Sequence, residues 1–401
     1  SQTKHSYGEQ NLRPPLEDDP MNQDQQLKVT RVLFFDQIKA LMIALVIAVH
    51  VVLAFSVSWI GVLIPNTGLP HPVFEGVLAW VATISNTFFM CMLFLLSGYF
   101  VPRSVHKKGI ALYLKDRLLR IGVPFLIGMV LINNVSVVVA RLSPNSPLAN
   151  LYWSELPINH VMVLWFLVVL FAFDLLYCAW IWWRGDHFAN DTSIPVPQQR
   201  SWLISAVLLA MMELLMAMQN DLWAALMHSP LDGLGAQGMH VMTYAFLFFL
   251  GCKASFHRWL ERLDAHLVVR WFRFSVVLSI SLLVLFIVLA FSAGGFGFYS
   301  GKISLLMAVL NPFIGWGIIA YLLLWFQRNE QRCGQRLATA GVDSFGAYII
   351  HPLVLVVVLE TFGFIGLNHW LVFGFVAALG IVISFGLSHQ LRRIPAVAKV
   401  I

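Results

Sequence analysis

Apolar runs long enough to cross a lipid bilayer recur along this chain from about residue 40 onward. A transmembrane helix needs about 20 consecutive, mainly apolar residues to span the hydrocarbon core. The runs lie near 40–62, 77–101, 119–140, 161–183, 202–218, 239–255, 272–293, 303–326, 342–362 and 370–390, of which the fifth and sixth are short. We therefore predict an all-α integral membrane protein with about ten transmembrane helices.

The composition agrees with this fold class. Hydrophobic residues make up 59% of the 401 residues and charged residues 11%, and the mean hydropathy is +0.77. Soluble domains contain about 45–50% apolar and about 25% charged residues. A water-soluble globule, a disordered chain, a coiled coil and a collagen are therefore excluded.

The basic residues predict how the chain is oriented in the lipid bilayer. Lys and Arg number 26 against 20 Asp and Glu, which gives a net charge of +6. The basic residues gather before the first run, in every second connection and after the last run, whereas the alternate connections hold only Arg141 and Lys302. Because basic residues favour the cytoplasmic side, we expect both termini to be cytoplasmic. The charge then sets topology, and no nucleic-acid partner is predicted.

The chain divides into a polar start, a membrane domain and a short end. Residues 1–31 are polar and lack the apolar core of a signal peptide, so we predict a disordered cytoplasmic tail. Met21 is a candidate natural start, so the residues before it can be foreign to the protein. We predict the membrane domain over 32–392 and a cytoplasmic tail over 393–401.

Three ionisable residues lie in or just before the first run: Asp36, Lys39 and His50. They require an explanation, because a charge inside the bilayer costs roughly 2.5–3.5 kcal/mol. On a helix Lys39 and His50 differ by about 20° around the axis, and Asp36 lies about 40° from His50, so the three share one stripe. An imidazole can accept a proton from a hydroxyl near neutral pH. The pattern favours a charged pair near the cytoplasmic end, in line with a deep histidine that acts as a general base. The alternative is an interfacial Asp36–Lys39 pair and a histidine that is only hydrogen-bonded between helices.

A basic cluster follows the second run. Arg117 and Arg120 are three residues apart, so we expect them on one side of a helix start, and we expect Pro124 to limit or kink the next helix. Two guanidinium groups at the cytoplasmic face can bind phosphate groups bidentately. Ordinary anchoring of the helix at the cytoplasmic side is the alternative for both residues.

Other polar and aromatic residues lie within or beside the later runs. Asp174 and Glu213 are candidates for structural hydrogen bonding or for function. Trp165 is expected in an interfacial aromatic belt. Tyr348 and His351 recur at helical spacing, and a proline follows His351, which can therefore bond a carbonyl that the proline leaves without a donor.

Common catalytic motifs are missing from the sequence. No Walker A loop, Rossmann fingerprint, HExxH or GxSxG motif occurs, so ATPase, dehydrogenase, zincin and serine-hydrolase functions lack support. The histidines show no metal-binding spacing, and no metal site is predicted.

Taken in chain order, these residues resemble the motifs of membrane acyltransferase family 3. The family has about ten helices, an Arg-x10-His motif in the first helix, an SG-x-F/Y segment at the end of the second, then R-x-x-R, WFL and a late S-Y/F-x-x-Y-x-x-H block. The matching residues are Lys39-x10-His50, Ser97-Gly98-Tyr99-Phe100, Arg117-x-x-Arg120, Trp165-Phe166-Leu167, and Ser344-Phe345 through Tyr348 and His351. Together these matches cover most of the chain.

The resemblance implies transfer of an acyl group, commonly acetyl or succinyl, from acyl-CoA to a hydroxyl of a glycan or related cell-envelope compound, in the bacterial inner membrane. It implies that His50 is the base, with Lys39 and Asp36 in the same site, and that Arg117 and Arg120 contact the coenzyme A phosphates. Trp165, Tyr348 and His351 then have substrate or structural roles. Acyl-CoA is a co-substrate, and no permanently bound cofactor is expected. Direct transfer is expected, because no cysteine or serine has a base neighbour in sequence.

One residue departs from the family pattern. Lys39 stands where the family has arginine, and lysine keeps the charge but lacks the bidentate fork. Two other functions therefore remain open at this stage. One is a transporter or flippase whose polar path is lined by Asp36, Lys39, Asp174 and Glu213. The other is a catalytically silent membrane scaffold.

Overall fold

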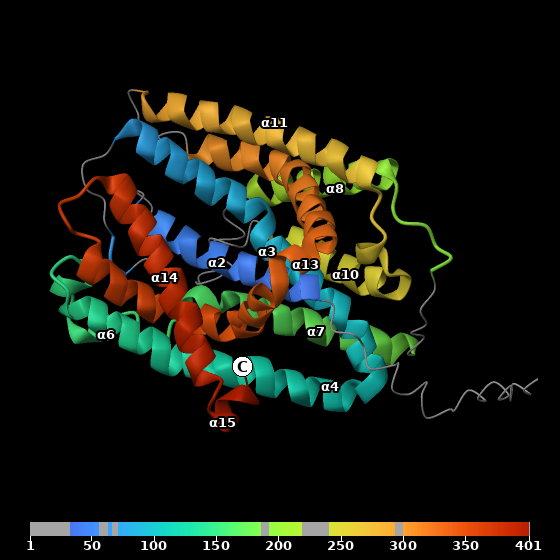
Figure 1. Ribbon diagram of the computed structural model, residues 1–401, viewed down its shortest axis with the longest axis horizontal. Coiled ribbons are helices and arrows are strands. Elements are labelled where there is room, and N and C mark those ends of the chain that lie inside the picture. The colour runs from blue at the N-terminus through green and yellow to red at the C-terminus, as the bar shows by residue number, and fades with distance from the viewer. Residues whose placement is uncertain are drawn as a thin grey trace, which may run out of the picture.

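The computed structural model describes residues 33–55, 63–65, 71–185, 192–218, 240–292 and 300–400. Within these ranges every regular element is a helix and no strand occurs, so the predicted all-α class is confirmed for the described part of the chain. Figure 1 shows the helices packed side by side, with many axes running in similar directions. The predicted N-terminal tail, 1–31, lies outside the described residues.

The longer elements are a series of helices. They are α2 (Leu33–Phe55), α3 (Pro72–Lys108), α4 (Ile110–Arg117), η1 (Leu118–Gly122), α5 (Val123–Ile127), η2 (Gly128–Asn133), α6 (Asn134–Leu142), α7 (Trp165–Arg184), α8 (Gln199–Met218), α10 (Val241–His257), α11 (Ala265–Ala290), α13 (Ser300–Phe362), α14 (His369–Leu391) and α15 (Pro395–Ala398). Short 3₁₀ turns, η3 (Pro147–Asn150), η4 (Trp153–Glu155) and η5 (Met162–Leu164), connect α6 to α7, and η7 (Trp259–Glu261) follows α10.

Seven segments of the described residues are long and apolar enough to cross a membrane. They are Leu33–Phe55, Pro72–Lys108, Ile110–Leu142, Met162–Arg184, Ala265–Ala290, Leu305–Phe362 and His369–Leu391. Each of the ten predicted runs overlaps one of these segments, α8 or α10. The number of separate segments is lower than ten because α8 does not qualify, α10 has a length of only 17 residues, and the eighth and ninth runs both fall within Leu305–Phe362.

Helix α13 is bent between the eighth and ninth runs. Its backbone leaves the helical region at Asn329 and at Gly334, and Figure 1 shows the helix changing direction along its length. The Gln37 side chain donates from Nε2 to the carbonyl oxygens of Glu330 and Gly334, at 2.9 and 3.1 Å. The Leu33 backbone N–H donates to Glu330 Oε1 at 2.8 Å. The start of α2 therefore satisfies the backbone groups that the bend exposes.

The third membrane segment, Ile110–Leu142, continues through Pro124. We predicted that this proline limits or kinks the helix. It does not end the helix, which continues to Leu142, and two wider π-helical stretches, η1 and η2, lie on either side of it. Proline lacks the N–H of the normal helical bond, and a local π turn can absorb that loss without ending the helix. Leucine and valine side chains of this segment are exposed, as expected of a face that contacts lipid.

Helix α2 lies in the middle of the bundle, in contact with α3, α13 and α14. Its closest neighbour is α13, where the Gly341 position meets the backbone of Asp36. A Cβ atom at residue 341 would lie 1.9 Å from the Asp36 carbonyl oxygen. Only glycine permits this approach, because the obstacle is backbone and cannot rotate away.

Substitution of Gly341 by alanine is therefore expected to separate α2 from α13. We expect a loss of stability of about 1–3 kcal/mol, the usual cost of overpacking, seen as a lower midpoint of thermal unfolding in detergent. Gly374→Ala in α14 is the matched control, since no atom lies within 4 Å of the corresponding Cβ position. Equal midpoints of thermal unfolding for the two variants would show that α2 and α13 can move apart without loss of stability.

Candidate active site

Two histidines from helices far apart in the sequence meet inside the bundle. His50 projects from α2 and His351 from the second arm of α13, and their ring centroids are 4.9 Å apart with the rings nearly edge to face. His351 is fully buried, whereas His50 is half-buried. This pairing of two imidazoles is the central feature of the site.

Each imidazole is oriented by a backbone carbonyl of its own helix. His50 Nδ1 lies 2.8 Å from the Val46 carbonyl oxygen, and His351 Nδ1 lies 2.6 Å from the Tyr348 carbonyl oxygen. A carbonyl oxygen only accepts, so Nδ1 carries the hydrogen in both rings. In a neutral imidazole this leaves Nε2 as a proton acceptor. The Nε2 atom of His351 is buried without a hydrogen-bond partner among the described residues.

The Tyr348 carbonyl is the group that Pro352 leaves without its helical donor, because the two residues are four apart. The contact with His351 is therefore the one expected of a histidine that precedes a proline. The hydroxyl of Tyr348 donates to the Val163 carbonyl oxygen. This bond ties the second arm of α13 to η5, at the start of α7.

A small cavity lies beside the two histidines. Its volume is about 30 Å³, enough for one water molecule. The other walls are formed mainly by Ile64, Met162, Val163 and Leu355. Met162 has a φ of 45°, in the left-handed region that a non-glycine residue seldom adopts. The site is thus a tight, mainly apolar chamber whose polar groups are two imidazoles.

Trp165 begins α7 close to this chamber in sequence, but its ring lies in the core. Only 7% of its surface is exposed, and it stacks on Tyr244 with ring centroids 5.7 Å apart. The position of Trp165 at the membrane interface concerns its depth in the bilayer and stays a prediction. The structure shows that the ring packs in an aromatic cluster with Tyr244 and Phe94, where burial of aromatic surface is favourable.

The other two ionisable residues of α2, Asp36 and Lys39, lie near its start, as the sequence predicted. Lys39 Nζ lies 3.4 Å from Asp36 Oδ1, and it also lies 5.1 Å from the centre of the Phe100 ring of α3. The Asp36 side chain is 7% exposed and that of Lys39 33%. His50 comes eleven positions after Lys39, which corresponds to a rise of about 16 Å along the helix. The pair and the histidine therefore belong to one helix but do not touch.

The SG-x-F segment of α3 is explained by its neighbours. A Cβ atom at residue 98 would lie 2.0 Å from the Phe248 carbonyl oxygen, so Gly98 lets α3 and α10 pack with their backbones in contact. The Tyr99 hydroxyl donates to Glu261 Oε1 at 2.5 Å. These contacts place Phe100 beside Lys39.

Arg117 and Arg120 do not share one environment. Arg117 Nε lies 3.1 Å from Asp174 Oδ2 of α7 and donates to the Tyr113 hydroxyl at 2.8 Å. The Tyr113 hydroxyl in turn donates to Asp174 Oδ1 at 2.7 Å, so Asp174 is held from both sides. Arg120 lies in η1 and is exposed. The wider π turn between the two arginines helps to separate directions that an α-helix would bring together.

Comparison with known protein families identifies the family of this chain. A family model described as an acyltransferase domain matches residues 32–389, nearly the whole chain. The chain belongs to membrane acyltransferase family 3. No curated protein gave a significant match. The resemblance drawn from the sequence motifs is thereby confirmed, and this membrane protein is an acyltransferase.

The four residues proposed for a transport path belong to three separate polar contacts in this acyltransferase. Glu213 of α8 accepts from Thr243 of α10, contacts His240 Nδ1 at 3.0 Å and accepts from Asn311 of α13 at 3.4 Å. Asp174 is paired with Arg117, and Asp36 with Lys39. Each carboxylate thus has local partners, which explains its tolerance at membrane depth. We do not retain the transporter alternative for a chain that belongs to an acyltransferase family.

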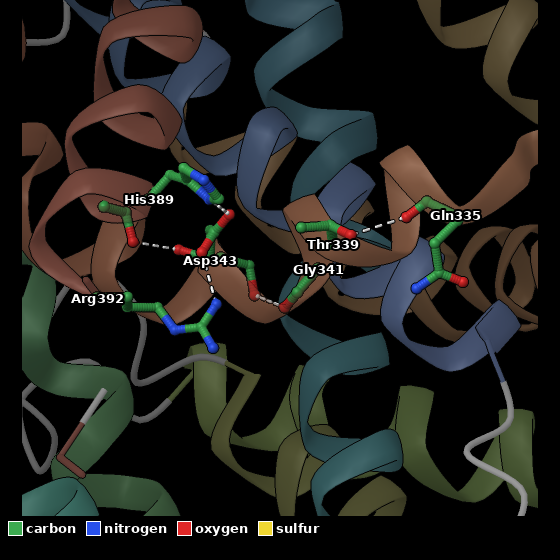
Figure 2. A network of polar contacts seen from close by, with 8 residues as sticks. Gln335, Thr339, Gly341, Asp343, His389 and Arg392 are labelled. Atoms are coloured by element: carbon green, nitrogen blue, oxygen red, sulfur yellow. Dashed lines mark hydrogen bonds and ion pairs between the residues drawn. The ribbon is translucent and has the colours of Figure 1, made fainter. Parts of the chain in front are cut away.

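One polar cluster of the acyltransferase was not predicted from its sequence. Asp343 of α13 accepts from Arg392 Nη1 at 2.6 Å and lies 2.9 Å from His389 Nδ1, as Figure 2 shows. The Ser388 hydroxyl donates to the Asp343 backbone carbonyl at 2.6 Å. The cluster fastens the arm of α13 that carries His351 to the end of α14. Its only signal in the sequence is an acidic residue directly before the late family motif.

No metal centre is visible in the described ranges of the acyltransferase. Among those residues no group of three or more His, Cys, Asp or Glu side chains is placed to hold a metal ion.

Proposed function

We propose that this acyltransferase moves an acetyl- or succinyl-type group from acyl-CoA to a hydroxyl of a glycan or related cell-envelope compound, with His50 as the general base. The observation that carries the proposal is the state of the His50 ring. Its Nδ1 is occupied by the Val46 carbonyl, so Nε2 is the nitrogen that can accept a proton. The ring lines a cavity in the membrane interior, beside His351.

The proposed reaction is a direct transfer. The acceptor oxygen attacks the thioester carbonyl carbon while His50 Nε2 takes the hydroxyl proton. The carbon–sulfur bond then breaks, and the leaving coenzyme A thiolate takes the proton from His50. Ester and free thiol are the products, so the proton balance needs no other group. His351, whose Nε2 has no partner among the described residues, is a second place where this proton can rest.

The donor is proposed to approach from the start of α2. Lys39 is one-third exposed there, and Arg120 is exposed on η1, so both are available to the phosphates of coenzyme A. Arg117 can contribute only in addition to its bond with Asp174. The cavity at His50 holds about one water molecule, so the thioester arm of the donor reaches His50 only when this chamber widens.

The topology is proposed to be ten crossings with both termini cytoplasmic, in a bacterial inner membrane. The bend of α13 at Asn329 and Gly334 supports a separation of that helix into two crossings, with Arg328, Arg332 and Arg336 around the bend. Basic residues of this kind favour the cytoplasmic side. The start of α2, which the bend contacts, is then cytoplasmic as well.

The donor side can be tested with purified protein in nanodiscs supplied with acetyl-CoA or succinyl-CoA. We expect release of free coenzyme A thiol and, in Lys39→Gln and Arg120→Gln, a rise in the donor KM of about tenfold, because a charged hydrogen bond to phosphate contributes about 1.5–3 kcal/mol. Lys399→Gln, at an exposed position in the C-terminal tail, is the control with unchanged KM. Absence of thiol release with every short acyl-CoA would overturn the donor assignment. Mass spectrometry of envelope glycans with and without the gene tests the acceptor class.

A further inference from the structure

A second cavity, much larger than the one at the histidines, lies between α8, α10 and the first arm of α13. Its volume is about 950 Å³, at the upper end of the range of small-molecule sites. Most of its wall is aromatic or aliphatic, formed by residues such as Trp202, Phe246, Leu250, Trp259, Trp316 and Leu323. In the part of the chain that the structure describes, the two cavities have no lining residue in common, so we treat this one as separate from the candidate active site.

The charged side chains of this apolar cavity are both basic. Arg200 lies in the first turn of α8, and Lys253 lies near the end of α10, with Nζ 5.7 Å from the centre of the Trp259 ring. Both side chains are exposed, and no carboxylate of the described residues lines the cavity. The cavity therefore combines a long apolar interior with positive charge on its wall.

An adjoining cavity of about 690 Å³ extends the positive charge. It shares Val196, Pro197, Gln198 and Arg200 with the first, and it adds Arg270 of α11. Asp264 also lines it, but one oxygen of this carboxylate accepts from the His266 backbone N–H at the start of α11. Arg200 is thus the basic residue that the two cavities share, whereas Lys253 lines only the first and Arg270 only the second.

Helix α8, which lines the large cavity, also carries exposed apolar side chains. Leu203, Ile204 and Leu208 of α8 are 48–59% exposed, and apolar side chains of this size favour contact with lipid in a membrane protein. Trp202 and Trp259 lie near the basic residues, and tryptophan commonly marks the level of the lipid headgroups. An occupant can therefore reach the cavity from within the membrane.

We infer that this cavity binds a membrane lipid with an anionic phosphate headgroup. The acyl chains lie along the aromatic and leucine wall, and the phosphate lies between Arg200 and Lys253. A guanidinium and an ammonium group match a phosphate in charge and hydrogen bonding, whereas a zwitterionic headgroup brings its own cation into the same place. The inference does not depend on acyl transfer at His50, because the two sites share no residue.

The test uses the full chain in mixed vesicles that contain equal amounts of phosphatidylglycerol and phosphatidylcholine, followed by native mass spectrometry of the retained lipid. We expect phosphatidylglycerol to be retained about tenfold over phosphatidylcholine, because two basic side chains attract the anionic headgroup. The double variant with Arg200→Gln and Lys253→Gln should lose this preference. Leu250→Trp, which fills the apolar wall, should lower retention of both lipids.

Arg273→Gln is the matched control, an exposed arginine of α11 that lines neither cavity. It should retain lipid as the wild type does. Equal retention of the two lipids by the wild type overturns the inference, and so does a double variant that keeps the preference while its thermal unfolding is unchanged. If the double variant does not fold, the single variants Arg200→Gln and Lys253→Gln, both at exposed positions, test the same loss of preference for phosphatidylglycerol.

Discussion

Replacement of His50 by asparagine is expected to lower the rate of acyl transfer by about 10²–10⁴-fold, the contribution typical of a general base. Asparagine can still donate to the Val46 carbonyl oxygen, which His50 Nδ1 contacts at 2.8 Å. It has no basic nitrogen to take up the hydroxyl proton. The variant therefore separates the catalytic role from the structural one, and release of coenzyme A thiol by the purified protein measures the loss.

Two further variants make this result interpretable. His266→Asn, at an exposed position at the start of α11, should keep the wild-type rate. His351→Asn decides which of the two facing imidazoles is the base, since His351 lines the same cavity. Full activity in His50→Asn together with a lost rate in His351→Asn would transfer the role of base to His351. Full activity in both variants would place the chemistry elsewhere.

Replacement of Asp174 by alanine is expected to have the largest effect on stability. Its side chain is fully buried in α7 and holds both Arg117 and Tyr113. Without it the Arg117 guanidinium, whose side chain is only 24% exposed, loses its counter-ion. Removal of one partner from a buried ion pair costs about 3–5 kcal/mol. We therefore expect a clear fall in the unfolding midpoint in detergent and in the yield of folded protein.

The double variant with Asp174→Leu and Arg117→Met should recover most of that loss, because replacement of both charges by apolar groups is often neutral. Asp116→Ala is the control on the same segment, since Asp116 pairs with Lys108 at the surface and should melt like the wild type. The double variant also tests Arg117 as a donor contact. An unchanged donor KM in a folded double variant would assign Arg117 to structure alone.

Contacts made within one helix could be predicted from the sequence. The Asp36–Lys39 pair follows from a spacing of three residues, and the bond from His351 to the Tyr348 carbonyl follows from the proline that comes next. Both depend on helix geometry, which is the same wherever the helix packs. The membrane segments and the family motifs are of the same kind, because length, apolarity and residue order are properties of the chain.

Contacts between helices could not be predicted in this way. The spacing of Arg117 and Arg120 placed them together, but Asp174 on another helix binds only the first of them. Trp165 stacks on Tyr244 of α10, a partner that nothing in its own segment indicates. In each case a residue distant in sequence determines the environment.

The sequence by itself determined that this protein is a helical membrane acyltransferase and which side chains are available for its chemistry. The tertiary structure decided which of them meet. His50 comes beside His351 because Gly341 lets α13 approach the backbone of α2 and because Asp343 fastens the same arm of α13 to α14. The physical reason is that a residue's position on its helix is set by local geometry, whereas its partner is set by the packing of helix faces across the whole bundle.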